Sequence, residues 1–180
     1  MKFCSCCGAS VSLRTPPGDS LPRHVCDECG EIHYVNPKIV VGALAEHKGK
    51  VLLCRRAIDP RKSLWTLPAG FMEMAETTAD AARRETQEEA CADVELIELY
   101  TLVNIAHIGQ VYMLYRAKLD APVFAPGEES LEVALFEESE IPWEQIAFRS
   151  ISVTLKHYFE DRARGAFQFR TIDLLPPPTF

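Results

Sequence analysis

The sequence has no apolar run long enough to cross a membrane, no excess of positive charge and no internal repeat. A spanning helix needs about 18 or more consecutive apolar residues, and no window of the 180 residues approaches that length. The start, Met1-Lys2-Phe3-Cys4, lacks the apolar core of a secretory signal. We therefore expect a soluble, cytoplasmic protein that has no membrane partner.

Basic residues are outnumbered by acidic ones, which gives a formal net charge of −7. Proteins that bind long nucleic acids usually carry a basic stripe, so this balance argues against a polyanion as the main partner. A small phosphate substrate is still compatible with it, because a bound cation can invert the electrostatics of an acidic pocket.

The length suits one ordinary domain with a small appendage, and the apolar fraction of 47% is enough for a core. Three parts are expected. Residues 1–35 form a Cys-rich segment, residues 36–165 form the main domain, and residues 166–180 form a C-terminal tail whose run Pro176–Pro178 cannot continue a helix.

Five of the seven cysteines lie within the first 29 residues, in two Cys-x-x-Cys pairs that are each followed by glycine. Without an export signal, such clustering favours metal over disulfides. The two pairs predict a structural, four-sulfur Zn²⁺ site in a zinc ribbon, with Cys4, Cys7, Cys26 and Cys29 as ligands. Cys6 is expected to be a bystander, and Cys54 and Cys91 are expected to be small buried thiols.

The rest of the chain reads as strands, a helix, further strands and a second helix. Periodicity and residue type predict strands over 38–47, 50–55, 63–67, 94–103, 110–119 and 131–136, and helices over 77–90 and 150–163. This order is typical of an α+β domain in which a mixed sheet lies between helices.

Three carboxylates share one face of the first predicted helix, because Glu85, Glu88 and Glu89 stand at i, i+3 and i+4. Arg84 lies beside them and can pair with Glu88. A solvated acidic patch is the alternative. In a semi-buried cleft, however, two carboxylates about 6 Å apart repel by roughly 3 kcal/mol at an effective dielectric near 20. Such a cleft would favour Mg²⁺ or Mn²⁺, which prefer carboxylate oxygens.

The run Gly70-x5-Glu76-x7-Arg84-Glu85-Thr86-x-Glu88-Glu89-x-Cys91-Ala92 resembles the Nudix box, G-x5-E-x7-R-E-U-x-E-E-x-G-U, where U is a bulky aliphatic residue. Thr86 and Ala92 replace the two aliphatic positions and Cys91 replaces the final glycine. These departures concern packing and helix termination, not the ionisable set. With the flanking strands, the resemblance covers about residues 37–160.

The resemblance implies a Nudix α/β/α sandwich and cation-dependent cleavage of a diphosphate linked to another moiety. It implies that Glu85 and Glu89 bind the catalytic Mg²⁺ or Mn²⁺ with help from Glu88. Arg84 would orient a glutamate, and Glu76 would brace the junction between loop and helix. The backbone carbonyl of Ala69 is a further metal ligand.

Family members often place an extra acidic residue in a loop that matches 126–130 here. Glu129 is the candidate for this catalytic role and Glu128 the substitute. Two solvated loop acids are the alternative.

The combination of zinc ribbon and Nudix domain resembles the NADH-pyrophosphatase group. The stretch S-Q-P-W-P-F-P of the NADH-cleaving branch is missing, and residues 100–107 read YTLVNIAH instead. The layout also resembles a group that includes plant FAD pyrophosphatases. FAD or ADP-ribose-like dinucleotides therefore rank first as substrates, with AMP as a product, NADH second and nucleoside triphosphates third. A homodimer is compatible with the resemblance, because many family members pair.

Two residues are candidates for contacts with the nucleotide. Arg55 is the basic candidate for a phosphate among three arginines near the predicted hairpin, which include Arg56 and Arg61. A solvated strand-end charge is the alternative for each of them. Phe71 could stack on a base, whereas Trp65 is expected to pack in the core. His107 is expected to be structural or to lie on the surface.

Two other functions are weighed against the enzyme. A catalytically silent nucleotide sensor with the ribbon as its docking module is one, but the intact acidic cluster disfavours it. Recognition of nucleic acid by the ribbon is the other. Residues 1–35 give it little support, because they hold Lys2, Arg14 and Arg23 against Asp19, Asp27, Glu28 and Glu31.

Overall fold

The computed structural model describes residues 1–176 and divides into two compact units, Met1–Pro37 and the part from Lys38 onward. The last two residues of the predicted proline run, Pro177 and Pro178, lie outside the described residues. Within the described part, no helix combines the length and apolar character that crossing a bilayer requires.

The first unit is a small three-stranded antiparallel sheet in the order β1-β2-β3. Its strands are β1 (Val11–Arg14), β2 (Arg23–Cys26) and β3 (Ile32–His33). A unit this small buries little apolar surface, and units of this size usually need a metal or disulfides for stability.

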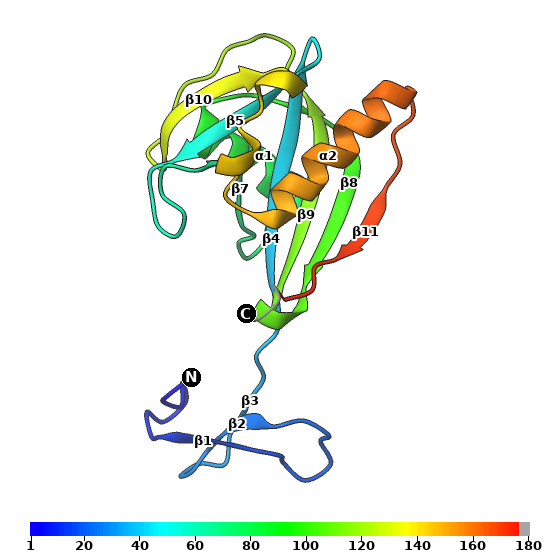
Figure 1. Cartoon of the computed structure of the whole chain (residues 1–180). Helices are drawn as coiled ribbons and strands as arrows, with labels where there is room; N and C mark the ends of the chain where they lie inside the picture. The colour runs from blue at the N-terminus through cyan, green and yellow to red at the C-terminus, as the bar shows by residue number, and fades with distance from the viewer. Residues whose placement is uncertain (177–180) are drawn as a thin grey trace. The chain divides into compact units, whose positions relative to one another are not determined.

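The second unit is built on a mixed sheet in the order β10-β5-β4-β9-β8-β11 (Figure 1). Its long strands are β4 (Lys38–His47), β5 (Lys50–Arg56), β8 (Glu95–Ile105), β9 (Gln110–Lys118) and β10 (Ser130–Phe136). Parallel pairing joins β4 to β9, and antiparallel pairing joins β9 to β8 and β5 to β10. Short 3₁₀ turns cover Ala106–Ile108, Glu138–Glu140 and Trp143–Gln145.

The two helices lie on opposite faces of this sheet, α1 (Thr78–Ala90) on one and α2 (Arg149–Arg164) on the other (Figure 1). Successive side chains of a strand point to opposite faces. In β4, Val41 packs with Ala81 and Ala82 of α1, whereas Leu44 packs with Ile151 and the rest of the apolar stripe of α2. The predicted α/β/α sandwich with a mixed sheet is therefore confirmed.

Strands β4 and β5 pair with each other only beside their hairpin, where Glu46 and His47 meet Val51 and Lys50. Beyond it, β5 pairs with the short strand β6 (Trp65–Thr66), and β4 pairs with β7 (Ala69–Phe71). Gly42 allows this approach, because a Cβ at that position would collide with the Pro68 carbonyl. The sheet thus opens between β4 and β5, and the chain from β6 through β7 leads directly into α1.

Helix α1 starts and ends with recognisable caps. Thr77 is its N-cap and accepts a hydrogen bond from the Asp80 N–H at 3.1 Å. Cys91 is the C-cap, in the left-handed conformation at φ 47°. The expectation that Cys91 is buried is wrong, because a C-cap at the end of this helix faces solvent, whereas Cys54 of β5 is buried as expected.

The segment after α2 adds a strand that sequence analysis did not predict. Strand β11 (Arg170–Asp173) pairs in parallel with β8 and extends the sheet by one position. Asp161 of α2 is 1% exposed and holds the segment in place. It accepts hydrogen bonds from Arg170 at 2.5 and 2.6 Å and from the Tyr100 hydroxyl at 2.8 Å, and these hydrogen bonds hold its pKa down at about 2.

Candidate functional site: an acidic cleft beside helix α1

A cleft of about 990 Å³ opens in the second unit where β4 and β5 diverge. One side carries the carboxylates of α1, and the other carries residues from the turn after β8 and from the start of α2. The glutamates Glu85, Glu88, Glu89, Glu128 and Glu129 all line it, together with Arg84, Ala69, Gly70 and Phe71. The structure therefore brings together most of the residues predicted from the sequence.

Two of the three helical carboxylates are buried at the base of this cleft. Glu85 and Glu89 are 7% and 6% exposed, while Glu88 is exposed at the rim. Burial raises the pKa of Glu89 to about 8, and the negative charge of Glu85 adds to the effect. Burial also raises the pKa of Glu85, although Arg84 opposes this shift. Both groups are therefore strained as free anions, and a cation would relieve that strain.

The glycine turn before the helix makes room for these carboxylates. A Cβ at Gly70 would collide with the carboxylate of Glu85, so only glycine leaves that group in its place. The neighbouring residue makes a polar contact with the helix, because the Ala69 N–H donates a hydrogen bond to the Glu89 carboxylate at 3.3 Å. The turn before α1 is therefore packed closely against both buried carboxylates.

Arg84 joins the acidic residues of the box into one network. Its Nε and Nη2 donate to the two oxygens of Glu76 at 3.0 and 2.9 Å, and Nη2 also donates to the Phe71 carbonyl at 3.2 Å. Its Nη1 donates to Glu85 at 2.8 Å and to Glu88 at 2.9 Å. Arg84 therefore ties the loop before α1 to the carboxylates on the helix.

The loop before β10 lies against the end of α1. The Gly127 N–H donates to the Glu89 carbonyl at 3.2 Å, and a Cβ at Gly127 would collide with the Glu88 carbonyl. This close approach brings Glu129 to the cleft, where its charge contributes to the raised pKa values of Glu85 and Glu89. Glu128 lines the cleft as well, and both loop acids are exposed.

The donor set fits a divalent cation. It consists of hard carboxylate oxygens, two of which belong to buried groups whose ionised form lacks solvation. Among residues 1–176, only the four ribbon cysteines bring three or more ligand atoms within 4.8 Å of one another. The glutamates of the cleft do not form such a group of three ligand atoms. Glu85 and Glu88 are instead each paired with Arg84. Glu85 and Glu89 would hold the ion, with Glu88, Glu129 and the Ala69 carbonyl within the same cleft.

Of the three arginines named from the sequence, Arg56 and Arg61 line the cleft and Arg55 does not. Adjacent residues of β5 point to opposite sides, and Arg55 is turned toward the Ser63 carbonyl at 3.1 Å and toward Glu132 at 3.5 Å. Arg56 lines the cleft, donates to the Pro60 carbonyl at 3.0 Å and lies 5.2 Å over the ring of Phe148. Its positive charge reaches Glu89, whose pKa it lowers in part. Sequence reasoning named both arginines, but only the sheet register decides between them.

The other predicted residues divide in the expected way. Phe71 is 49% exposed in the cleft, with the Lys38 ammonium 4.9 Å from its ring centroid, so one face can still meet a base. Trp65 is buried in the core against Phe136. His107 is exposed in the turn after β8 and lines the far part of the cleft.

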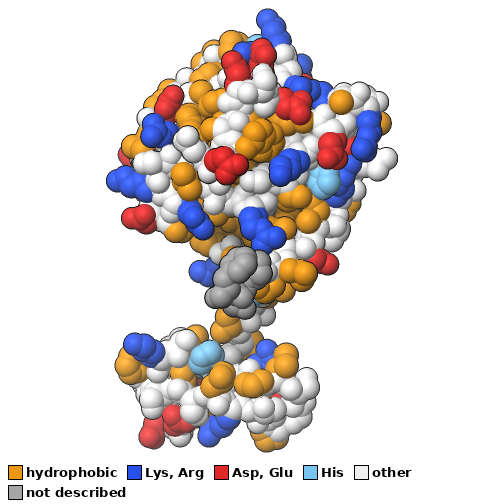
Figure 2. Space-filling view, in the orientation of Figure 1, with side chains coloured by type: hydrophobic (Ala, Val, Ile, Leu, Met, Phe, Trp, Pro, Cys, Tyr) orange, Lys and Arg blue, Asp and Glu red, His pale blue; other side chains and the backbone are white. Residues whose placement is uncertain are grey.

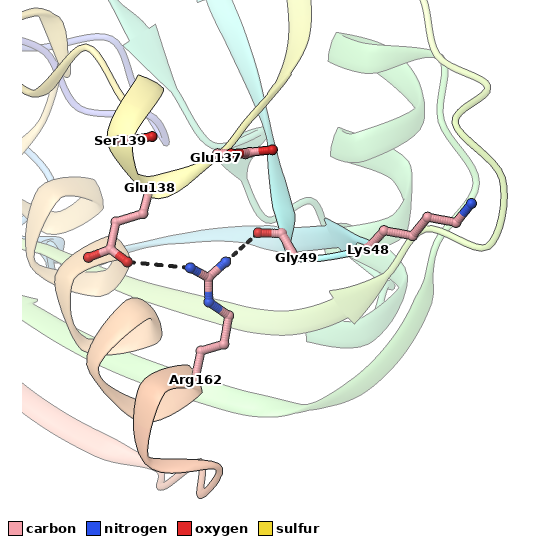
Figure 3. Close-up of a pocket in the computed structure, with 6 residues that line it drawn as sticks. All are labelled: Lys48, Gly49, Glu137, Glu138, Ser139 and Arg162. Atoms are coloured by element: carbon pink, nitrogen blue, oxygen red, sulfur yellow. Dashed lines mark hydrogen bonds and ion pairs between the residues drawn. The ribbon is translucent and has the colours of Figure 1, made fainter.

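A second hollow of about 650 Å³ lies beside the β4–β5 hairpin (Figure 3). Arg162 donates there to the Gly49 carbonyl and to Glu138, and Figure 3 shows the Lys48 side chain directed away from both. Its main positive charge is therefore already satisfied within the protein. The hollow holds no carboxylate cluster comparable to that of α1.

The four cysteines of the ribbon form a compact group. Their sulfurs all lie within 4.8 Å of one another, with 3.8 Å between Cys4 and Cys29 and 3.4 Å between Cys7 and Cys26. Four sulfurs about 2.3 Å from a tetrahedral zinc ion stand about 3.8 Å apart, so the group fits structural Zn²⁺. Cys6 is exposed and lies outside the group, as expected. Four thiolates leave no open position for a substrate.

Comparison with known proteins agrees with the fold and the cleft. Residues 2–35 match the family model described as Nudix N-terminal, and residues 36–158 match that of the NUDIX domain. The chain is similar to the NAD-capped RNA hydrolase NudC of Photobacterium profundum, with 29% identity over 143 residues, which cover 78% of this chain and 51% of that protein. An ADP-ribose pyrophosphatase of Methanocaldococcus jannaschii is 39% identical over 56 residues, which cover 31% of this chain and 33% of that protein.

Among solved structures, a NUDIX hydrolase from Nitrosomonas europaea superposes with a TM-score of 0.90 at 57% identity, covering 97% of this chain and 100% of that one. The chain therefore belongs to the Nudix family and carries the family's N-terminal zinc-ribbon domain. The prediction of a Nudix enzyme is confirmed at the level of the family. The chain spans about half the length of the NudC protein it matches.

Proposed function

We propose that the protein hydrolyses the pyrophosphate bond of a nucleoside diphosphate derivative in a reaction that depends on Mg²⁺ or Mn²⁺. The preferred class is a dinucleotide such as FAD or ADP-ribose, and AMP is one product. A single observation carries the proposal: Glu85 and Glu89 are buried side by side at the base of a large cleft, and both have raised pKa values.

A bound divalent cation would neutralise diphosphate oxygens and lower the pKa of an attacking water. The protein's own part is to hold the carboxylates in place. Arg84 fixes Glu85 through Nη1 and is itself fixed by Glu76. Glu129, which lines the cleft from the loop before β10, would take up a proton from the water.

The cleft is large enough for a dinucleotide. Ligand sites for drug-sized molecules measure about 300–1,000 Å³, and this cleft lies at the upper end of that range at about 990 Å³. Arg56 can meet a phosphate, because no acidic side chain within residues 1–176 forms an ion pair with it. Phe71 offers an exposed ring close to the carboxylates.

The names of the relatives support the same class of chemistry. A NudC protein acts on an NAD cap according to its name, and an ADP-ribose pyrophosphatase on ADP-ribose. Both substrates carry a diphosphate that links a nucleoside to a second group. On the face that Figure 2 shows, acidic and basic side chains are interspersed, which favours a small substrate over a long RNA. The protein is placed in the cytoplasm, where reducing conditions keep cysteines available as zinc ligands.

A substrate panel tests the proposal. The purified protein is incubated with FAD, ADP-ribose, NADH and a nucleoside triphosphate, each with Mg²⁺, with Mn²⁺ and with neither, and AMP is followed by chromatography. We expect AMP from FAD or ADP-ribose only in the presence of a cation. Tight binding of these compounds without turnover under every metal condition would instead favour the silent sensor with the ribbon as its docking module.

A further inference from the structure

The C-terminal segment contributes one side chain, Leu174, to the lining of the cleft. Leu174 follows β11, and its N–H donates to the Asn104 carbonyl at 2.9 Å. Ile172 and Leu174 stand at i and i+2 and therefore share one face of the strand. Both pack on the cluster of Val40, Val103, Ile105 and Tyr112, and Leu174 also lines the cleft.

Three polar contacts fix this segment against the rest of the unit. Arg170 is bound by buried Asp161 through two hydrogen bonds. The Asn104 amide donates to Asp173 at 2.8 Å, and Arg149, which itself lines the cleft, donates to the Leu175 carbonyl at 2.8 Å. The segment is thus an ordered wall and not a loose tail.

A buried polar atom stands beside this wall. Ser150 at the start of α2 lines the cleft and is 1% exposed, yet its hydroxyl has no hydrogen-bond partner among the described residues. A buried hydroxyl without a partner costs free energy. The cluster of Leu174 includes Val153, one turn after Ser150. The hydroxyl therefore lies where a ligand that contacts Leu174 could also accept or donate a hydrogen bond.

We propose that Leu174 and Ser150 recognise an aromatic ring system with a polar edge that the substrate carries. This rests on the proposed function and names the part of the dinucleotide that the C-terminal segment selects. Apolar contact with Leu174, Ile105 and Tyr112 gives affinity for the face of the ring. The hydroxyl of Ser150 can form a hydrogen bond with a nitrogen or oxygen at the edge of the ring. A ring without such an atom leaves the hydroxyl unpaired and therefore binds more weakly.

Variants of these two residues test the proposal, with Leu175→Ala as matched control because that side chain is 73% exposed and is not among the residues lining the cleft. Leu174→Ala should raise KM for FAD or ADP-ribose about tenfold with little change in kcat, because one lost apolar contact in a pocket is worth about that factor or more. Ser150→Ala should raise KM several-fold while the melting temperature stays level, since a merely structural hydroxyl without a partner has no bond to lose. Leu175→Ala should match the wild type.

Calorimetric binding of FAD and ADP-ribose without Mg²⁺ or Mn²⁺ separates this proposal from the catalytic one. Suppose that neither compound is hydrolysed with any metal but that binding weakens in Leu174→Ala and Ser150→Ala. The proposed recognition of the ring by these two residues is then supported, and the proposed activity fails. Unchanged KM and unchanged binding in both folded variants would overturn the proposed recognition of the ring, whatever the enzyme's activity. Absence of both binding and hydrolysis for the two compounds in the wild type, with and without Mg²⁺ or Mn²⁺, would overturn both proposals.

Discussion

The backbone N–H of Gly127 donates a hydrogen bond to the carbonyl of Glu89, 3.2 Å away, so a loop glycine is attached to the residue at the centre of the acidic cluster. Two residues earlier, the Ala125 N–H donates to the Ala90 carbonyl at 2.9 Å. The end of α1 thereby serves as the anchor of the loop that carries Glu128 and Glu129. The distance between helical and loop carboxylates depends on this attachment.

Substitution of Gly127 by alanine should therefore separate the two sets of carboxylates. A Cβ would collide with the Glu88 carbonyl, so the loop has to move away from the helix. We expect kcat to fall about 100-fold, the size of effect that a displacement of about 1 Å can have. Steady-state kinetics check this, with Ala121→Gly in the exposed part of the same loop as control. A Gly127→Ala enzyme with normal kcat would show that Glu129 has no part in the reaction.

Neutralising Glu89 should have opposite effects on activity and on metal-free stability. Glu89→Gln should lower kcat by about two to three orders of magnitude, as the loss of a key charge-stabilising group does. In magnesium- and manganese-free buffer the same variant should melt above the wild type, because it no longer buries a strained carboxylate. Glu88→Gln is the control, since Glu88 is exposed and should show a smaller effect in both measurements. Equal effects at the two positions would remove the metal assignment to the buried pair.

The two neighbouring arginines of β5 should differ in their effect on substrate binding. Arg56→Ala removes one of the positive charges that line the cleft, and we expect KM for the dinucleotide to rise about tenfold or more, since hydrogen bonds to charged groups are worth about 1.5–3 kcal/mol. Arg55→Ala should leave KM close to the wild-type value, because its partners Ser63 and Glu132 lie outside the cleft lining. The reverse result would restore the sequence-based choice of Arg55.

Replacing Cys91 by glycine should stabilise the protein without changing its kinetics. Cys91 adopts φ 47° as the C-cap of α1, and the left-handed conformation costs a residue with a Cβ roughly 1–2 kcal/mol. Glycine recovers most of this but gives up backbone entropy, so a net gain of about 0.5–1 kcal/mol is expected. Thermal melting should show a rise of a few degrees, and a fall would mean that the thiol makes a stabilising contact.

The bond between Asp161 and Arg170 should make stability depend on pH in the acid range. The pKa of Asp161 is lowered from 3.8 to about 2, chiefly by Arg170, so the carboxylate adds stability above its unfolded pKa and loses it as pH falls through the folded value. The full contribution is about 2 kcal/mol. The difference in unfolding free energy between wild type and Asp161→Asn should therefore shrink by about 1 kcal/mol from pH 6 to pH 3.

Urea titrations followed by tryptophan fluorescence can measure this difference. The only two tryptophans, Trp65 and Trp143, both lie in the second unit, so the signal reports on the domain that contains Asp161. A difference that stays constant with pH would mean that the pKa of Asp161 is not lowered in the folded protein.

The sequence alone predicted the features that depend on the spacing of nearby residues. The i, i+3 and i+4 positions placed Glu85, Glu88 and Glu89 on one helix face, and the Cys-x-x-Cys pairs brought four sulfurs together. Helix α1 has its N-cap at Thr77, the first residue of the predicted range, and both strands of the β4–β5 hairpin were predicted to within one residue.

The sequence did not predict the features that depend on contacts between distant parts of the chain. The choice between Arg55 and Arg56 depends on which side of β5 faces the cleft, and that side is set by the pairing with β6 and β10. Strand β11 has only four residues, too few for a periodic signal, and it forms because Asp161 binds Arg170 nine positions away. The role of Leu174 in the cleft follows from that pairing and has no mark in the local sequence.

Strand β11 also protects the protein from association. Without it, β8 would present a row of unpaired N–H and C=O groups along the sheet margin, and such a margin can recruit strands from other molecules. The strand that takes its place is short and carries Arg170 and Asp173, features that natural proteins use against edge-to-edge aggregation. The segment that brings Leu174 to the cleft therefore also covers the margin of β8.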